Sequence, residues 1–164
     1  MGKDKQMRRR AVRTYADTSV FGGVFDPGFA VASARFFDKV RAGLFQLVVS
    51  AIVADELVEA PKRVRDLFDE ILPLAEVIPV SEEVTALQEA YLNAKIVTSN
   101  WAGDAMHVAL ATVAHCDLIV SWNFEHIVHF QRIPRYNAVN ALHDYPAIAI
   151  HSPLEVVPDE EERG

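Results

Sequence analysis

Short apolar segments alternate with longer segments of helical periodicity along most of the chain. The apolar segments predict strands, and the repeat of apolar residues every three or four positions predicts helices between them. Pro79 lacks a backbone donor, so it weakens the third strand or places it at a sheet edge. The predicted strands span residues 12–16, 45–49, 76–80, 117–121 and 147–150, with helices starting near 18, 29, 51, 62, 81, 101 and 136.

Strands separated by helices favour parallel pairing, with helices on both faces of an α/β sheet. No repeat or low-complexity linker interrupts this pattern. We therefore predict one domain over residues 12–157, between a flexible basic arm (1–11) and an acidic tail (158–164). Both ends fit solvated termini, but the arm could also contact RNA phosphates and a charged tail could contact a partner protein.

Composition narrows the class of protein. The 164 residues suffice for one core, and 51% hydrophobic with 24% charged residues argues against disorder. No apolar run approaches the roughly 20 residues that span a membrane, and the basic start has no apolar stretch typical of a secretory signal. The lone Cys116 excludes an internal disulfide and a cysteine zinc site and fits a small buried residue. We expect a cytoplasmic protein.

Three acids fall where the ends of parallel strands should meet. Asp17 ends the first strand, Glu56 lies about two helical turns beyond the second, and Asp104 is in the first turn of a helix. Ligands of open α/β sheets bind at that edge, and clustered carboxylates suit Mg²⁺ or Mn²⁺. Without metal the acids should repel one another and have raised pKa values. Structural alternatives are an N-cap for Asp17, a first-turn acid for Asp104, and a solvated helix position for Glu56, near Asp55 and Glu59.

Four segments of the chain carry a resemblance to a known protein family. They are YADTSV (15–20), VVSAIVADEL (48–57), DAMHVALA (104–111) and LIVSWNFEH (118–126). In this order they resemble the motifs of the PIN-domain family, in particular VapC-like ribonuclease toxins. The resemblance runs from about Thr14 to about Glu155. It implies a three-layer α/β PIN-like fold, with a parallel five-stranded sheet flanked by helices.

The resemblance also implies roles for individual residues. Asp17, Glu56 and Asp104 match the catalytic acids that bind Mg²⁺ or Mn²⁺, with Glu56 rather than Asp55 as the second. Thr18 follows the first acid and supports it. VapC-like proteins usually pair with an antitoxin and often form homodimers, so we expect an RNA substrate, an antitoxin and a homodimer.

Asn123 departs from the family pattern, since many members carry Asp there. Asn keeps an oxygen but loses the charge. This leaves two interpretations: weaker metal binding with retained activity, or a site that needs only three acids. Ser-Trp-Asn-Phe-x-His also occurs in a subset of PIN-like proteins. Ser121 matches a Ser/Thr position that can bond near the metal or phosphate, and Glu125 is a candidate substitute ligand.

Histidines and tryptophans add further candidates. His107 lies one turn after Asp104, where it could bond that carboxylate, reach a phosphate or belong to the core. We interpret the spacing of His126 and His129 as chance. Trp101 and Trp122 fit either the core or the rim of the site, where an aromatic ring could stack a base. The pair at 22–23 is too short for a glycine-rich phosphate loop.

Three functions remain open on this basis. The leading hypothesis is a PIN-type, toxin-like endoribonuclease that hydrolyses RNA phosphodiesters through metal-activated water. The net charge of −7 and Asn123 motivate an alternative, a catalytically weakened RNA- or protein-binding module. The third, a metal-dependent hydrolase of small phosphate esters, lacks a dedicated nucleophile in the sequence.

Overall fold

A five-stranded parallel sheet forms the centre of the molecule. The computed structural model describes residues 10–157, so residues 1–9 of the predicted arm and the acidic tail lie outside it. The strand order is β3-β2-β1-β4-β5, and every neighbouring pair is parallel. The prediction of a parallel five-stranded α/β sheet is confirmed. The strands are β1 (Val12–Ala16), β2 (Phe45–Ser50), β3 (Ala75–Ile78), β4 (Leu118–Val120) and β5 (Ala149–His151).

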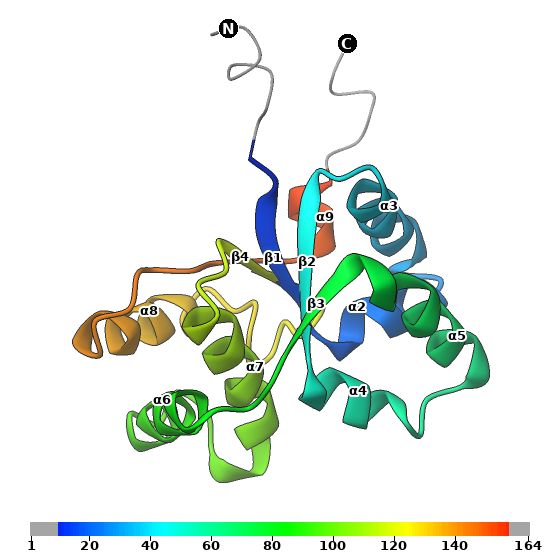
Figure 1. Ribbon diagram of the computed structural model, residues 1–164. Coiled ribbons are helices and arrows are strands. Elements are labelled where there is room, and N and C mark those ends of the chain that lie inside the picture. The colour runs from blue at the N-terminus through cyan, green and yellow to red at the C-terminus, as the bar shows by residue number, and fades with distance from the viewer. Residues whose placement is uncertain (1–9, 158–164) are drawn as a thin grey trace, which may run out of the picture.

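Helices cover both faces of this sheet and complete three layers (Figure 1). One face carries α2 (Thr18–Gly23), α3 (Ala30–Arg41), α4 (Ala51–Leu57), α5 (Lys62–Ile71) and α9 (Pro153–Val156). The other carries α6 (Glu82–Asn93), α7 (Ala102–Val113) and α8 (Ile133–Leu142). Short 3₁₀ turns, η1 (Leu72–Leu74) and η2 (Ser99–Trp101), precede β3 and α7. Within residues 10–157, no helix is long and apolar enough to cross a membrane.

The core explains why these segments adopt this arrangement. The middle strands β1, β2 and β4 are largely buried, as expected where helices cover both faces of a parallel sheet. Phe21, Phe36, Phe37 and Phe68 pack edge to face or tilted on the α3 side. Cys116 is buried, as expected, and this burial raises the pKa of its thiol to about 12.

The remaining differences from prediction lie at element ends. β3 occupies a sheet edge and stops before Pro79, which cannot donate a ladder hydrogen bond. The helix predicted to begin at Ser81 is α6, which Ser81 caps. Helix α8 begins at Ile133, three residues before the predicted start, because Pro134 fits a first helical turn. β5 is shifted toward the C-terminus, and the short α9 was not predicted. Ser152 and Glu155 form a capping box around Pro153 that starts α9.

Candidate active site

Asp17 lies at the carboxyl end of β1, where the chain turns into α2. Its Oδ1 accepts hydrogen bonds from the Ser19 backbone N–H at 3.2 Å and the Ser19 hydroxyl at 2.6 Å. Its Oδ2 accepts the Ser121 hydroxyl at 2.6 Å, which joins the end of β1 to the end of β4. Asp17 is therefore an N-cap, but one that is only 4% exposed. Burial raises its pKa, and the charge of His107 and the serine hydroxyls offset only part of that rise.

Glu56 is joined to the sheet through a chain of buried hydrogen bonds. The Nε2–H of His107 donates to Glu56 Oε1 at 2.7 Å. On the other side of the ring, His107 Nδ1 lies 2.7 Å from the Tyr15 hydroxyl, which lies 2.8 Å from Ser50 Oγ. Ser50 also caps α4, the helix that carries Glu56. The chain of bonds thus fixes Glu56 from β1, β2 and α7 together.

The charges of all three predicted acids affect the pKa of His107. Burial lowers the pKa of His107, but the bond to Glu56 and the charges of Asp17, Glu56 and Asp104 raise it above its ordinary value. In its protonated form, the ring would offset part of the repulsion among the acids.

The same contacts correct one electrostatic expectation. Raised pKa values were expected for the acids without metal, and this holds for Asp17. It is wrong for Glu56. Burial raises the pKa of Glu56, but the bond and charge of His107 and the hydroxyl of Thr18 outweigh burial, and the net shift is downward.

Asp104 has a different histidine partner. The Nδ1–H of His126 donates to Asp104 Oδ2 at 2.8 Å, and the His126 side chain is nearly buried. The ring of Trp101 lies over that of His126, with 4.6 Å between centroids and 30° between planes. We interpreted the spacing of His126 and His129 as chance; the structure shows that His126 bonds Asp104, whereas His129 Nδ1 accepts the backbone N–H of Gln131. His107 bonds Glu56 rather than Asp104, the acid one turn away in sequence.

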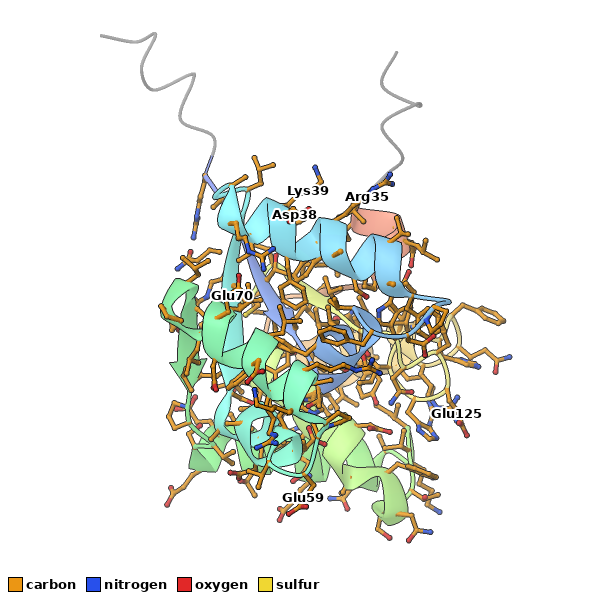
Figure 2. The ribbon with its side chains drawn as sticks, turned by 90° about the vertical axis from the view of Figure 1, so that its right-hand side faces the viewer. Arg35, Asp38, Lys39, Glu59, Glu70 and Glu125 are labelled. Atoms are coloured by element: carbon orange, nitrogen blue, oxygen red, sulfur yellow. The ribbon has the colours of Figure 1, made fainter. Side chains whose placement is uncertain are left out.

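The loop after β4 uses Asn123 as a turn residue. Asn123 Oδ1 accepts the His126 backbone N–H at 2.9 Å, and the Asn123 N–H donates to Ser121 Oγ at 2.9 Å. Glu125, the candidate substitute ligand, has a side chain that is 78% exposed, with Oε1 3.5 Å from His126 Nε2. Figure 2 shows it at the surface of this loop. Asn123 therefore holds the backbone of His126, the histidine whose side chain bonds Asp104.

Two predicted supporting residues, Ser121 and Thr18, bond the acids, but Thr18 bonds a different acid from the one predicted. Ser121 bonds Asp17 directly, but the Thr18 hydroxyl donates to Glu56 Oε1 at 2.7 Å rather than to Asp17. Ser19 contacts Asp17 instead, and its hydroxyl also accepts the Trp122 N–H at 2.9 Å. Thr18 therefore connects the first two acidic motifs.

The donor chemistry fits Mg²⁺ or Mn²⁺, since both ions favour carboxylate oxygens. Among residues 10–157, however, no group of three or more His, Cys, Asp or Glu side chains is placed so that it could hold a metal ion. Glu56 and Asp104 instead direct an oxygen at His107 and His126. Joint ligation by the three acids would therefore require their side chains to move.

Comparison with protein families gives a match that covers most of the chain. The model of the PIN domain matches residues 14–133, which contain every predicted site residue. The chain belongs to the PIN-domain family. A comparison with curated proteins finds no matching relative.

Solved structures support the same fold for this PIN domain. VapBC2 from Rickettsia felis, bound to a DNA fragment from its promoter, aligns with a TM-score of 0.56 at 15% identity, covering 86% of this chain and 98% of that chain. VapBC from Salmonella typhimurium, bound to DNA, gives 0.55 at 15% identity, with 87% and 98% covered. FitAB bound to an IR36 DNA fragment gives 0.53 at 17% identity, with 85% and 94% covered. At these identities the likeness establishes the fold alone.

Three residues that the sequence did not single out support the candidate site. Tyr15, Ser19 and Ser50 hold the acids or their partners, although their sequence context predicted only strand or cap positions. Tyr15 is two residues before Asp17, so strand alternation placed both on one face; this spacing was the available signal. For His126 no such signal existed, because its partner Asp104 is 22 positions away.

Proposed function

We propose that this PIN domain is a metal-dependent endoribonuclease of the VapC-like toxin type. The observation that carries the proposal is the hydrogen-bond network near the carboxyl end of β1, in which Asp17, Glu56 and Asp104 are each held by a side chain from another element. Burial of Asp17 with a raised pKa is unfavourable for stability. A role in metal binding and phosphodiester chemistry would give this buried carboxylate a purpose that stability does not.

Each acid is positioned by groups of this chain. When bound, Mg²⁺ or Mn²⁺ would activate a water and neutralise charge on the leaving oxygen. Ser19 and Ser121 hold both oxygens of Asp17, which fixes its carboxylate at the sheet edge. Thr18 and His107 orient Glu56, and His126 orients Asp104. His107 and His126 are the groups that would have to release an oxygen of their acid for it to join a metal site.

A protein partner is part of the proposal. The solved structures that share this fold are named as two-component assemblies, VapBC and FitAB, each bound to DNA. We infer that this chain likewise works with an antitoxin that binds DNA, and that it assembles as a homodimer. Co-expression of the chain with the product of a small neighbouring gene, followed by co-purification, would test the antitoxin.

The deciding experiment compares Asp104→Asn, Glu56→Gln and Asp55→Asn with the wild type. Asp55 is an exposed acid next to Glu56 on α4, so its variant removes the same charge outside the site. With Mg²⁺ or Mn²⁺, we expect the wild type and Asp55→Asn to cleave RNA, and the other two to lose at least about 100-fold in rate. The melting temperature of the wild type should rise with metal, and that of Asp104→Asn should rise less.

Equal cleavage by all four proteins would sink the proposal, because it would indicate a contaminant or a site without these acids. A second function is favoured by the turn-capping bond of Asn123, which uses the family's fourth acidic position for structure. In that case the chain is a PIN-like RNA- or protein-binding module. RNA binding that persists in EDTA, with no cleavage by the wild type in Mn²⁺, would support this second function.

A further inference from the structure

The two tryptophans of this chain have opposite environments. Trp122 is 6% exposed, stacks on Phe29 with 4.1 Å between ring centroids, and donates its Nε1–H to Ser33 at 2.8 Å. Trp101 is 49% exposed although it is among the largest apolar side chains. Tryptophan is on average highly buried, so an open indole beside a polar site is the exception. Trp122 packs the interior, and Trp101 does not.

Trp101 is linked to Asp104, a proposed catalytic acid, through a single residue, His126. Its ring covers His126, and His126 donates to Asp104 at 2.8 Å. The indole, the imidazole and the carboxylate therefore form a continuous series from solvent to the site. His126 covers one face of the indole, and about half of Trp101 remains exposed to solvent.

Charge indicates which part of a nucleic acid could use this surface. The chain carries a net charge of −7, and three acids meet at the site, so attraction of phosphates by bulk charge is weak. A nucleobase is neutral and has a π face, so stacking on an aromatic side chain binds it without a positive surface. Stacking also tolerates any base, because every base has such a face.

We propose that Trp101 stacks an unpaired base of the substrate, in the nucleotide at or next to the cleaved phosphate. The proposal rests on the ribonuclease function proposed above and assigns a base contact in it to one residue of this chain. A base inside a duplex is already stacked on both sides and cannot reach Trp101 unless the helix opens. His126 then has two roles as a positioning residue: it orients Asp104 and supports the underside of the indole.

The first test combines protein variants with an altered substrate. Trp101→Ala should lower kcat/KM on an unpaired RNA oligonucleotide by about 10- to 100-fold, and Trp101→Phe should restore most of it. Trp101→Leu keeps an apolar cover over His126 but has no π face, so it should behave like the Ala variant. Removing one base next to the cleavage position should lower wild-type kcat/KM by a similar factor and leave Trp101→Ala unchanged.

Phe130→Ala is the matched control. Like Trp101, Phe130 is an exposed aromatic residue, with 80% of its surface exposed. It lies in the segment after β4, and its ring stacks on His129 rather than on His126. We expect its variant to cleave like the wild type. Equal losses in Phe130→Ala and Trp101→Ala, or a Leu variant as active as the Phe variant, would overturn the assignment. Melting temperatures near that of the wild type exclude misfolding as the cause of any loss.

A binding measurement separates this inference from the nuclease proposal. In an Asp17→Asn background, which should not cleave, an unpaired oligonucleotide in Mg²⁺ should change the tryptophan emission. The change should vanish in Asp17→Asn/Trp101→Phe, where only the buried Trp122 emits. A blunt duplex that changes the emission as strongly would overturn the preference for unpaired bases. If the emission changes but the wild type does not cleave RNA, the stacking site stands and the nuclease proposal is rejected. If the wild type and the Trp101 variants cleave RNA equally well, the nuclease proposal stands and the stacking site is rejected.

Discussion

Single side chains at the carboxyl end of the sheet combine structural and chemical roles. Asn123 illustrates this, because its amide oxygen accepts the backbone N–H of His126 and so sets the turn that brings His126 to Asp104. An aspartate could accept the same bond, but it would add a negative charge to the loop that carries His126, the partner of Asp104. The neutral amide therefore keeps the turn without adding to the repulsion among the acids.

This role of Asn123 predicts a stability order among variants. Asn123→Ala removes the acceptor for the His126 N–H and should lower the free energy of unfolding by about 1 kcal/mol, as loss of a capping bond does. Asn123→Asp keeps an acceptor and should lose less. Chemical denaturation monitored by circular dichroism would measure the order. Identical midpoints for Asn123→Ala and the wild type would show that the turn does not depend on this bond.

At the scale of elements, α2 is packed closely against α3 and the loop after β4. A methyl group added at Gly23 would lie 2.6 Å from both Ser33 Oγ and Trp122 Nε1, well inside van der Waals contact. The hydrogen bond between these two groups holds them in place, so they cannot move aside without losing it. A glycine pair that seemed too short for a phosphate loop therefore has a packing explanation.

Neighbouring glycines of α2 provide a matched test of that packing. Gly23→Ala should destabilise the protein by about 1–3 kcal/mol, the usual cost of overpacking a core. Gly22→Ala has open space within 4 Å and should be neutral, or stabilising by up to about 1 kcal/mol through the helix preference of alanine. Thermal unfolding of both variants would compare them. Equal melting temperatures would contradict the close packing.

Local patterns predicted the elements well, and partners across the fold poorly. Helical periodicity located the start of α3 within one residue, and Pro79 was consistent with the edge position of β3. The motif order also marked the acids. The partner of Thr18, by contrast, depends on the placement of α4 beside α2, which no local pattern encodes. The start of α9 was missed because a Ser-Pro pair such as Ser152-Pro153 can either end a strand or begin a helix, as the N-cap and the first helical residue.

At the scale of the whole molecule, Arg13 of β1 connects the edge strand β3 to the helical layer that contains α7. Its guanidinium forms an ion pair with Glu76 of β3 at 2.7 Å, and its Nε–H donates to the Ala114 carbonyl after α7 at 3.0 Å. The bond to Arg13 holds the pKa of Glu76 below its ordinary value of 4.5. Since the Glu76 side chain is 46% exposed, solvent screening should keep the pair below about 1 kcal/mol.

This pair predicts a pH dependence of stability with a definite sign. The pKa of Glu76 is lower in the folded than in the unfolded chain, so the stabilisation is complete above pH 4.5 and is lost as pH falls through the folded value. Glu76→Gln should reduce the acid-side slope of unfolding free energy slightly. Arg13→Gln should reduce it equally, and the double variant no further. Additive changes in slope would show that the two residues act separately.

The ends of the described chain have a practical consequence for how the molecule is handled. Figure 1 shows that β1 starts and α9 ends on the side where β1 and β2 have their amino-terminal ends, whereas Asp17 follows the carboxyl end of β1. A tether from either end must run at least the length of β1, five residues or about 17 Å, to reach the acids. Immobilising the protein through either end would therefore leave its acidic edge facing the solution, while a fused inhibitory peptide would need a long linker.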